Sequence, residues 1–270
     1  MTTNPIYSTQ VESLPITIYN SNLEAGQAAA ADAAAYLKQV INERGHANVI
    51  LATGNSQLSF LETLRRAPGI DWSKMKFFHM DEYINLPAGH PASFPTFLQR
   101  HFLNHLQPPA GAFYPVPGQQ TDPGGRPEDI KGCQEYEELL RAHPADLCAL
   151  GIGENGHLAF NDPPFADFND PVWVKVVKLD EVSRRQQLGE GHFPDLQSVP
   201  THAITLTVPA LLAARKVLAI VPEARKAAAV QRAMRGPIDP NCPASILRRN
   251  PHVHLYLDRD SAATTFDLKG

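Results

Sequence analysis

DLCALGIGENGHLAFNDP, residues 146–163, joins an apolar run to a glycine-rich turn. The apolar residues 147–152 are typical of a buried strand in a parallel sheet, and three glycines then end that strand. Within a few residues the turn carries His157, Asn161 and Asp162. Since ligands bind beyond the carboxyl ends of strands in open α/β sheets, these side chains indicate a candidate acid–base site. The alternative is a tight turn whose polar groups only cap backbone amides.

A second strand end precedes this one in the chain. The apolar residues 48–52 are followed by a small polar turn and then by a helical pattern over residues 57–66. Unpaired N–H groups at the start of a helix attract phosphate, and hydroxyls and a glycine beside them favour close approach of a ligand. The turn therefore indicates a phosphate site formed by Thr53, Gly54, Asn55 and Ser56. An ordinary helix cap is the alternative.

Charged residues follow two further apolar runs. Asp81 and Glu82 come directly after residues 75–80, and in an extended chain they point to opposite sides, so one can face a crevice while the other pairs elsewhere. Lys226 lies near the start of a helix that follows the apolar residues 217–221, where it can neutralise a phosphate. Each position also suits a solvated strand end or an exposed helix lysine.

The alternation of strands and helices predicts an α/β fold: a single Rossmann-like domain with a mostly parallel sheet and helices on both faces. Residues 1–15 read as a loose N-terminal lead-in, and residues 16–270 as the domain. Residues 180–200 give no clear pattern. The expected strands are 16–19, 48–52, 75–80, 113–116, 147–152, 172–179, 203–208, 217–221 and 253–257. The expected helices are 22–43, 57–66, 93–106, 128–143, 209–215, 223–235 and 245–249.

Composition narrows the class of protein. The 270 residues include 24 Lys and Arg against 28 Asp and Glu, a net charge of −4, with no basic stripe, so we expect no nucleic-acid partner. The three cysteines are far apart, as free thiols in a reducing compartment would be. No apolar run has membrane-spanning length and the N-terminus lacks a signal-peptide core. A cytoplasmic protein without a membrane partner is expected.

Two histidine pairs have spacings that suit a metal, but neither has acidic or cysteine ligands beside it. His101 and His105 lie four apart on an expected helix, and His252 and His254 alternate on an expected strand. We interpret both pairs as packing or surface residues and predict no metal site.

Three blocks now occur in order after the ATGNS turn at residues 52–56. They are FHMDEYINLPAGHPASFPTFLQRHF, GIGENGHLAFNDP and AITLTVPALLAARKVLAIVPEARKAAAV. Over roughly residues 48–260 the chain resembles the glucosamine-6-phosphate deaminase family, within the wider group that holds 6-phosphogluconolactonases. The resemblance implies a single α/β domain and conversion of an amino-sugar phosphate to fructose 6-phosphate and ammonia. It also implies that the chemistry needs no metal or organic cofactor.

The resemblance assigns roles to individual residues. Asp81 matches the base that moves a proton between C2 and C1 of the opened sugar, and His157 matches the histidine that helps to open the ring. Asn155 and Asp162 occupy the positions that support this histidine. The family's phosphate-binding positions fall on Thr53, Gly54, Asn55, Ser56 and Lys226.

The chain departs from the family pattern at several positions. Many members have Asp at Asn155 and Glu at Asp162. The segment SRRQQLGEGHF, residues 183–193, also departs from A-N-[AS]-R-F-F, in which an arginine grips the phosphate. Arg184 or Arg185 is the candidate substitute.

Two other functions stay open at this point. A 6-phosphogluconolactonase would use His157 to activate water, although those enzymes typically show D-E-R where this chain has Asp81-Glu82-Tyr83. A sugar-phosphate-binding protein without catalysis would fit the altered Asn155 and arginine segment. The expected partner in every case is a small sugar phosphate. A glucosamine and a galactosamine substrate are both open, as are a monomer and a homo-oligomer.

Overall fold

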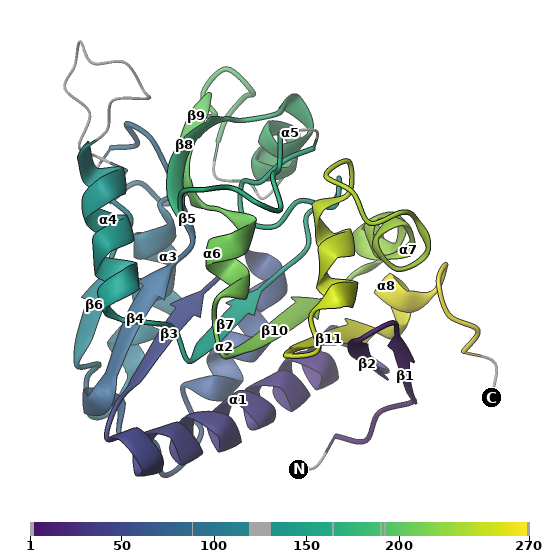
Figure 1. The fold of residues 1–270 in the computed structure, drawn as a ribbon, viewed down its shortest axis with the longest axis horizontal. Helices are drawn as coiled ribbons and strands as arrows, with labels where there is room; N and C mark the ends of the chain where they lie inside the picture. The colour runs from purple at the N-terminus through teal and green to yellow at the C-terminus, as the bar shows by residue number, and fades with distance from the viewer. Residues whose placement is uncertain are drawn as a thin grey trace.

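An eight-stranded sheet forms the centre of the computed structural model, which describes residues 3–87, 89–118, 131–163, 165–189, 191 and 193–268 (Figure 1). Its strand order is β1-β2-β11-β10-β7-β3-β4-β6. Every neighbouring pair is parallel apart from β1 and β2, so the predicted mostly parallel sheet is confirmed. The strands are β1 (Tyr7–Val11), β2 (Leu14–Tyr19), β3 (Ala47–Leu51), β4 (Met75–His79), β6 (Ala112–Tyr114), β7 (Leu147–Leu150), β10 (Lys216–Val221) and β11 (Val253–Asp258).

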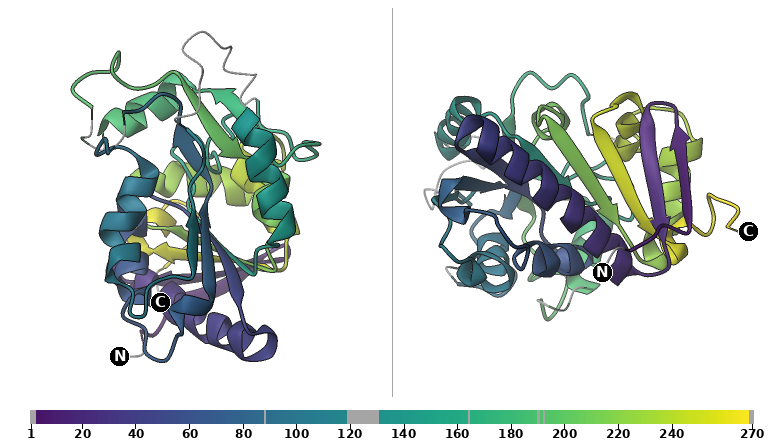
Figure 2. Two further views of the ribbon diagram at one scale, coloured as in Figure 1. Left: turned by 90° about the vertical axis from the view of Figure 1, so that its left-hand side faces the viewer. Right: turned by 90° about the horizontal axis from the view of Figure 1, so that it is seen from below.

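Helices cover both faces of this sheet. The α-helices are α1 (Asn22–Arg44), α2 (Leu58–Leu64), α3 (Phe94–His101), α4 (Lys131–Ala142), α5 (Glu181–Gly189), α6 (Val208–Leu212), α7 (Ala227–Arg235) and α8 (Arg259–Ala262). Shorter 3₁₀ segments are η1 (Asn55–Gln57), η2 (Trp72–Lys74), η3 (Leu103–His105), η5 (Ala224–Lys226) and η6 (Pro243–Arg249). Figure 2 shows α1 lying across one face.

The two faces of the sheet enclose two cores. Along β3, Val49 and Leu51 join the core beneath α1, α2 and α3, while Ile50 joins the core beneath α4, α6 and α7. Phe77 and Phe78 divide in the same way on β4. A strand buried on both faces must be apolar at every position, which is why these runs are continuous in the sequence.

The long helix α1 has defined ends and a defined packing face. Ser21 caps it by accepting a hydrogen bond from the Glu24 amide, and Gly45 ends it at φ 78°. At Gly26 an added Cβ would lie 2.8 Å from the Phe60 backbone nitrogen, so glycine there lets α2 pack directly against α1. This contact fixes the start of α2, which follows the polar turn at residues 53–56.

A second sheet was not predicted. Strand β5 (Asp81–Tyr83) pairs antiparallel with β9 (His202–Leu206), which pairs antiparallel with β8 (Val174–Lys178). Residues 172–179 and 203–208 were predicted as strands of one mostly parallel sheet. Strand patterns do not state which sheet a strand joins, and the chain leaves β4 at Met80, whose carbonyl accepts a hydrogen bond from Leu206. The helix α5 lies in residues 180–200, where no element was predicted.

The predicted loose lead-in over residues 1–15 was wrong in its second half. Tyr7–Val11 forms β1 and pairs with β2, which begins at Leu14. The side chains of β1 are mostly exposed, so this edge strand is held by backbone pairing and leaves little hydrophobic signal. The three cysteines are free, as expected. Among the described residues, no helix combines the length and apolar character that crossing a bilayer requires.

Candidate active site

Four neighbouring strands deliver the predicted site residues to one edge of the sheet. Strands β10, β7, β3 and β4 lie side by side and run parallel, so their carboxyl ends meet. From β3 the chain continues to β4 on one side and later returns to β7 on the other, which makes this the topological switch point where open α/β sheets bind ligands. A cleft of about 600 Å³, partly open to solvent, lies there.

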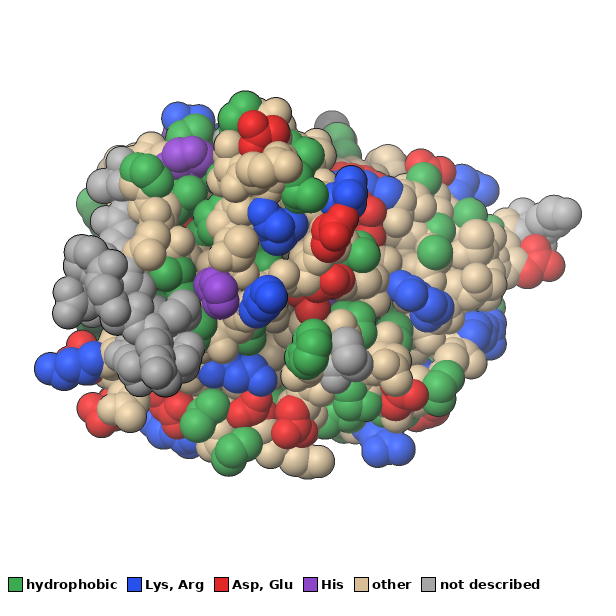
Figure 3. Space-filling view, turned by 90° about the horizontal axis from the view of Figure 1, so that it is seen from above, with side chains coloured by type: hydrophobic (Ala, Val, Ile, Leu, Met, Phe, Trp, Pro, Cys, Tyr) green, Lys and Arg blue, Asp and Glu red, His purple; other side chains and the backbone are tan. Residues whose placement is uncertain are grey.

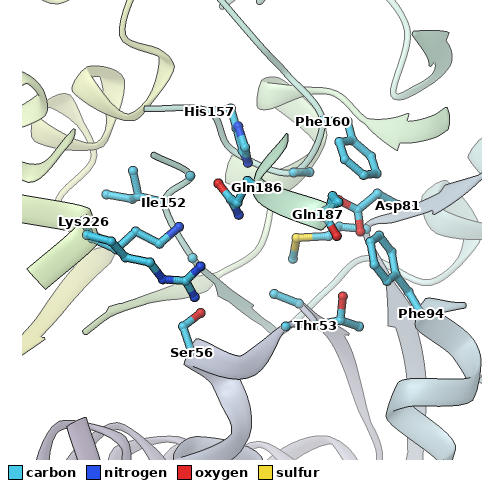
Figure 4. Close-up of a pocket in the computed structure, with 17 residues that line it drawn as sticks. Thr53, Ser56, Asp81, Phe94, Ile152, His157, Phe160, Gln186, Gln187 and Lys226 are labelled. Carbon is cyan, nitrogen blue, oxygen red and sulfur yellow. The ribbon is translucent and has the colours of Figure 1, made fainter. Parts of the chain in front are cut away.

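The cleft brings together six of the residues singled out from sequence. Its lining includes Thr53, Gly54, Ser56, Asp81, His157 and Lys226 (Figure 4). Asn55 is exposed and does not line it. Asn161 also lies outside the lining, and its amide instead donates to the carbonyls of Leu158 and Leu206, which anchors the glycine-rich turn.

Asn155 and Asp162 lie behind His157 rather than in the cleft. Asp162 Oδ1 lies 2.9 Å from His157 Nδ1 and accepts a hydrogen bond of 2.9 Å from the Asn155 side-chain amide. The side-chain oxygen of Asn155, Oδ1, accepts a hydrogen bond from the His157 backbone N–H at 3.0 Å. Because Nδ1 faces a carboxylate, we assign the proton of the neutral imidazole to Nδ1, which leaves Nε2 as an acceptor.

Gly153 makes room for this imidazole. A Cβ at Gly153 would lie only 2.1 Å from His157 Nε2, so any side chain there would displace the ring. The Gly153 amide donates to the His157 carbonyl at 2.9 Å and closes the turn. The G-x-G-x-N-G-H pattern is thus explained by the contact between the ring and the backbone.

Asp162 is held as a carboxylate. Burial raises its pKa, but hydrogen bonds from His157, Asn155 and Ser183 outweigh burial and lower the pKa to about 2. The Asp162 carboxylate lies beside Nδ1, so Nε2 is the ring nitrogen that can take a proton from a substrate and return it.

The adjacent carboxylates Asp81 and Glu82 point in different directions, as the extended chain predicts. Asp81 lines the cleft, whereas Glu82 accepts hydrogen bonds from Ser93 Oγ at 2.8 Å and from the Phe94 amide at 3.2 Å. Glu82 thereby fixes Phe94, whose ring is part of the cleft wall. Burial, and then the charge of Glu82, raises the pKa of Asp81 well above its usual range.

The opposite end of the cleft suits a phosphate. Gly54 has φ 96° and ψ 162°, a conformation open to glycine, and it precedes the helical segment η1–α2. The Gln57 side-chain amide donates to the Ile220 carbonyl at 3.0 Å, which ties this turn to the end of β10. Lys226 begins α7 as its N-cap and is 4% exposed.

Several cleft residues were missed from the sequence. Gln186 and Gln187 line the cleft from α5, and Ser183 on the same helix reaches the His157–Asp162 pair. Arg225 lines the cleft beside Lys226. The glutamines lie in a segment without hydrophobic periodicity, so only the departure from the family pattern at residues 183–193 pointed to them.

The structure does not bring the two predicted arginines to the phosphate end. Arg184 donates to the carbonyls of Leu196 and Val199, and Arg185 forms an exposed ion pair with Glu181. Neither lines the cleft. On α5 the face that carries Ser183, Gln186 and Gln187 is turned to the site, and helical spacing directs residues 184 and 185 elsewhere.

The described residues contain no group of three His, Cys, Asp or Glu side chains placed to hold a metal ion. Figure 3 looks on to the end of the molecule that carries the cleft, and basic and acidic side chains are interspersed on it. The visible surface therefore has no broad patch of one charge.

Comparisons with known proteins identify relatives of this chain. The sequence model of glucosamine-6-phosphate isomerases and 6-phosphogluconolactonases matches residues 20–256. A glucosamine-6-phosphate deaminase from Bacillus cereus is 34% identical over 227 residues, covering 83% of this chain and 80% of that protein. Another from Bacillus thuringiensis has the same identity and coverage.

Solved structures share the fold. A monomeric glucosamine-6-phosphate deaminase superposes with a TM-score of 0.80 at 26% identity, covering 92% of this chain and 99% of that one. A 6-phosphogluconolactonase from Trypanosoma brucei gives a TM-score of 0.72 at 18% identity, covering 95% and 99% of the two chains, and shows the fold alone. The chain therefore belongs to the family of glucosamine-6-phosphate isomerases and 6-phosphogluconolactonases.

Proposed function

We propose that this protein is a glucosamine-6-phosphate deaminase, which converts glucosamine 6-phosphate and water to fructose 6-phosphate and ammonia. The observation that carries the proposal is one cleft whose lining brings together Asp81, His157 and Lys226 with Thr53, Gly54 and Ser56 of the turn after β3 (Figure 4).

The reaction begins with opening of the sugar ring. His157 Nε2 takes the proton of the C1 hydroxyl and delivers a proton to the ring oxygen as the C1–O5 bond breaks, which gives the open-chain aldehyde. Asp162 stabilises the transient imidazolium, because its carboxylate lies 2.9 Å from Nδ1.

Asp81 then carries out the isomerisation. Its carboxylate removes the proton from C2 and returns it to C1, while a second proton passes from the substrate's ammonium group to the C1 oxygen. The C1 aldehyde thereby becomes a hydroxymethyl group and C2 becomes a protonated imine. Water adds to C2 and ammonia leaves, which generates the ketone of fructose 6-phosphate. A buried base with a raised pKa suits this transfer, since it keeps the proton between the two carbons.

The phosphate end holds the substrate in register. We assign its binding to the backbone and hydroxyls of Thr53, Gly54 and Ser56 and to the ammonium group of Lys226, all of which line the cleft. Asn55, which is exposed, is assigned to shaping the turn. The ammonium group supplies a point charge, and amides at the start of η1 supply directed donors.

The test is ammonia release from glucosamine 6-phosphate by the purified protein and its Asp81→Asn variant. Loss of a general base lowers rates by about 10²–10⁴-fold, and Asp81→Asn removes only the proton-accepting group. Asp71, a partly exposed residue on the segment before β4 and outside the cleft lining, supplies the matched control Asp71→Asn, which should leave turnover unchanged.

Hydrolysis of 6-phosphogluconolactone, measured in the same preparation, separates the two activities known in the family. The proposal fails if the lactone is hydrolysed and no ammonia is released. Unchanged ammonia release by Asp81→Asn would overturn the assigned base.

A further inference from the structure

We propose that Arg225 is the second cation of the phosphate site, held in position by Glu223 and Glu154. The inference rests on the proposed function, because it assigns a ligand to the 6-phosphate of that substrate. It also assigns to the segment after β10 a role that the sequence analysis gave to Arg184 or Arg185.

The position of Arg225 supports this assignment. It belongs to η5, which follows β10, and it lines the cleft together with Lys226 and with Gly54 and Ser56 from the turn after β3. Among the described residues, the basic side chains that line the cleft are Arg225 and Lys226. A phosphate dianion is matched by two positive charges, and a planar guanidinium adds directed hydrogen bonds that an ammonium group lacks.

Two carboxylates orient the guanidinium group. Arg225 Nε lies 2.5 Å from Glu223 Oε2, and its Nη1 lies 3.5 Å from Glu154 Oε1. Neither glutamate lines the cleft. Glu154 belongs to the glycine-rich turn after β7, so Arg225 spans two of the four turns that form the site. An arginine fixed in this way loses less side-chain freedom when it binds an anion.

The backbone at Glu223 adds a second line of argument. Glu223 has φ 85° and ψ 139°, a conformation that non-glycine residues rarely adopt, and it stands where Gly54 stands in the turn after β3. Its amide donates to both carboxylate oxygens of Asp258, at 3.1 and 3.0 Å, which holds the strained residue in place. Glu223 has a strained backbone and its side chain pairs with a cleft arginine, and this combination points to a functional role.

The other arginines near the site are committed elsewhere. Arg184 binds two backbone carbonyls, Arg185 pairs with Glu181, and Arg232 donates to the Glu154 carbonyl. The Arg232 contact supports the segment that carries Glu154, outside the cleft lining.

The experiment measures binding of inorganic phosphate by calorimetry, and KM and kcat for glucosamine 6-phosphate, in Arg225→Ala and Arg225→Lys. We expect Arg225→Ala to weaken phosphate binding about tenfold or more and to raise KM by a similar factor, with kcat within about threefold of wild type. Arg225→Lys should have a phosphate affinity and a KM between those of wild type and Arg225→Ala. Lysine keeps the positive charge but lacks the two parallel N–H donors of a guanidinium group. The exposed Arg66, distant in sequence from the cleft residues, supplies the charge-matched control Arg66→Ala.

The outcomes separate this inference from the proposed function. If no ammonia is released by any form but Arg225→Ala loses phosphate affinity, the inference stands and the proposed function fails. If Arg225→Ala, folded by circular dichroism, binds phosphate as wild type does, the inference is wrong. It is equally wrong if Arg185→Ala weakens phosphate binding as much as Arg225→Ala.

Discussion

A single oxygen of Asp162 accepts three side-chain hydrogen bonds. Besides His157 and Asn155, Ser183 Oγ donates to it at 2.5 Å, and the same hydroxyl lies 3.0 Å from His157 Nδ1. Ser183 is 1% exposed and belongs to α5, the helix that also carries Gln186 and Gln187 into the cleft. At the residue scale, Ser183 is therefore a positioning residue for the imidazole and for the carboxylate that contacts it.

Replacing Ser183 by alanine tests that role. A hydrogen bond to a carboxylate contributes about 1.5–3 kcal/mol, so we expect kcat for ammonia release to fall about tenfold or more with KM little changed. Ser183→Cys, of nearly the same volume and with a weak donor, should recover part of the loss. Val182→Ala on the exposed side of α5 is the control. Equal kcat in Ser183→Ala and wild type would contradict the role.

The sequence predicts some of these residues and misses others for a physical reason. Asp81, His157 and Thr53 each follow an apolar strand directly, and the end of a parallel strand is a place of known geometry. Ser183 carries no such mark, because its role arises only when α5 packs over the turn at 153–157. Arg225 adjoins the predicted Lys226, and its neighbours give no local sign of a cleft position.

At the scale of elements, the turns after β3 and β10 share one construction. Gly54 and Glu223 both have positive φ, each precedes a 3₁₀ segment, and each accepts a backbone hydrogen bond from the residue three positions on. Gln57 bridges the two turns through the Ile220 carbonyl. The phosphate end thus consists of two similar turns at a fixed separation.

The variant Glu223→Gly relieves the backbone strain of this turn and removes the Glu223 side chain. Relief of strain favours the variant by about 1–3 kcal/mol. The entropy of glycine costs about 0.5–1 kcal/mol, and the lost ion pair with Arg225 about 0–1 kcal/mol. We expect a free energy of unfolding in urea equal to wild type or about 1 kcal/mol higher, together with weaker binding of inorganic phosphate.

Glu223→Gln is the matched variant, because it keeps the strained backbone and loses the charge. It should weaken phosphate binding without the gain in stability. A Glu223→Gly protein that is less stable than Glu223→Gln and binds phosphate as wild type does would exclude this account of the turn.

Strands and helices with strong apolar patterns were predicted, whereas the second sheet and the edge strand β1, which are defined by strand pairing, were not. The strands β3, β4, β7, β10 and β11 are buried on both faces and read as apolar runs. The antiparallel sheet β5-β9-β8 depends on a bend at Met80 that no periodicity records. The edge strand β1 is mostly exposed, so it resembles a loop in sequence.

At the scale of the whole molecule, folding buries ionisable side chains at the site and shifts their pKa values. Glu82 is 4% exposed, and burial raises its pKa from 4.5 to about 7 although hydrogen bonds from Ser93, Tyr83 and Phe94 oppose the change. The folded state therefore binds a proton that the unfolded state releases between pH 4.5 and 7. Asp81 acts in the same direction, because its pKa is also raised. The pKa of Asp162 is lowered instead, so its contribution to the free energy of unfolding is lost as pH falls from 3.8 towards about 2.

The contribution of Glu82 to the free energy of unfolding should accordingly decline as pH rises through the range 4.5 to 7, whereas that of His79, whose pKa burial lowers from 6.5 to about 3, should rise between pH 3 and 6.5. A change in pKa from 4.5 to about 7 corresponds to about 3 kcal/mol for Glu82. Urea denaturation of wild type and Glu82→Gln at pH 5, 6, 7 and 8 measures it. The side-chain nitrogen of glutamine cannot accept a hydrogen bond as a carboxyl oxygen can, so the variant should be less stable at pH 5. The difference in stability from wild type should shrink between pH 5 and 8, because only wild type has the ionising group at this position. Parallel pH profiles for the two proteins would show that Glu82 does not take up this proton.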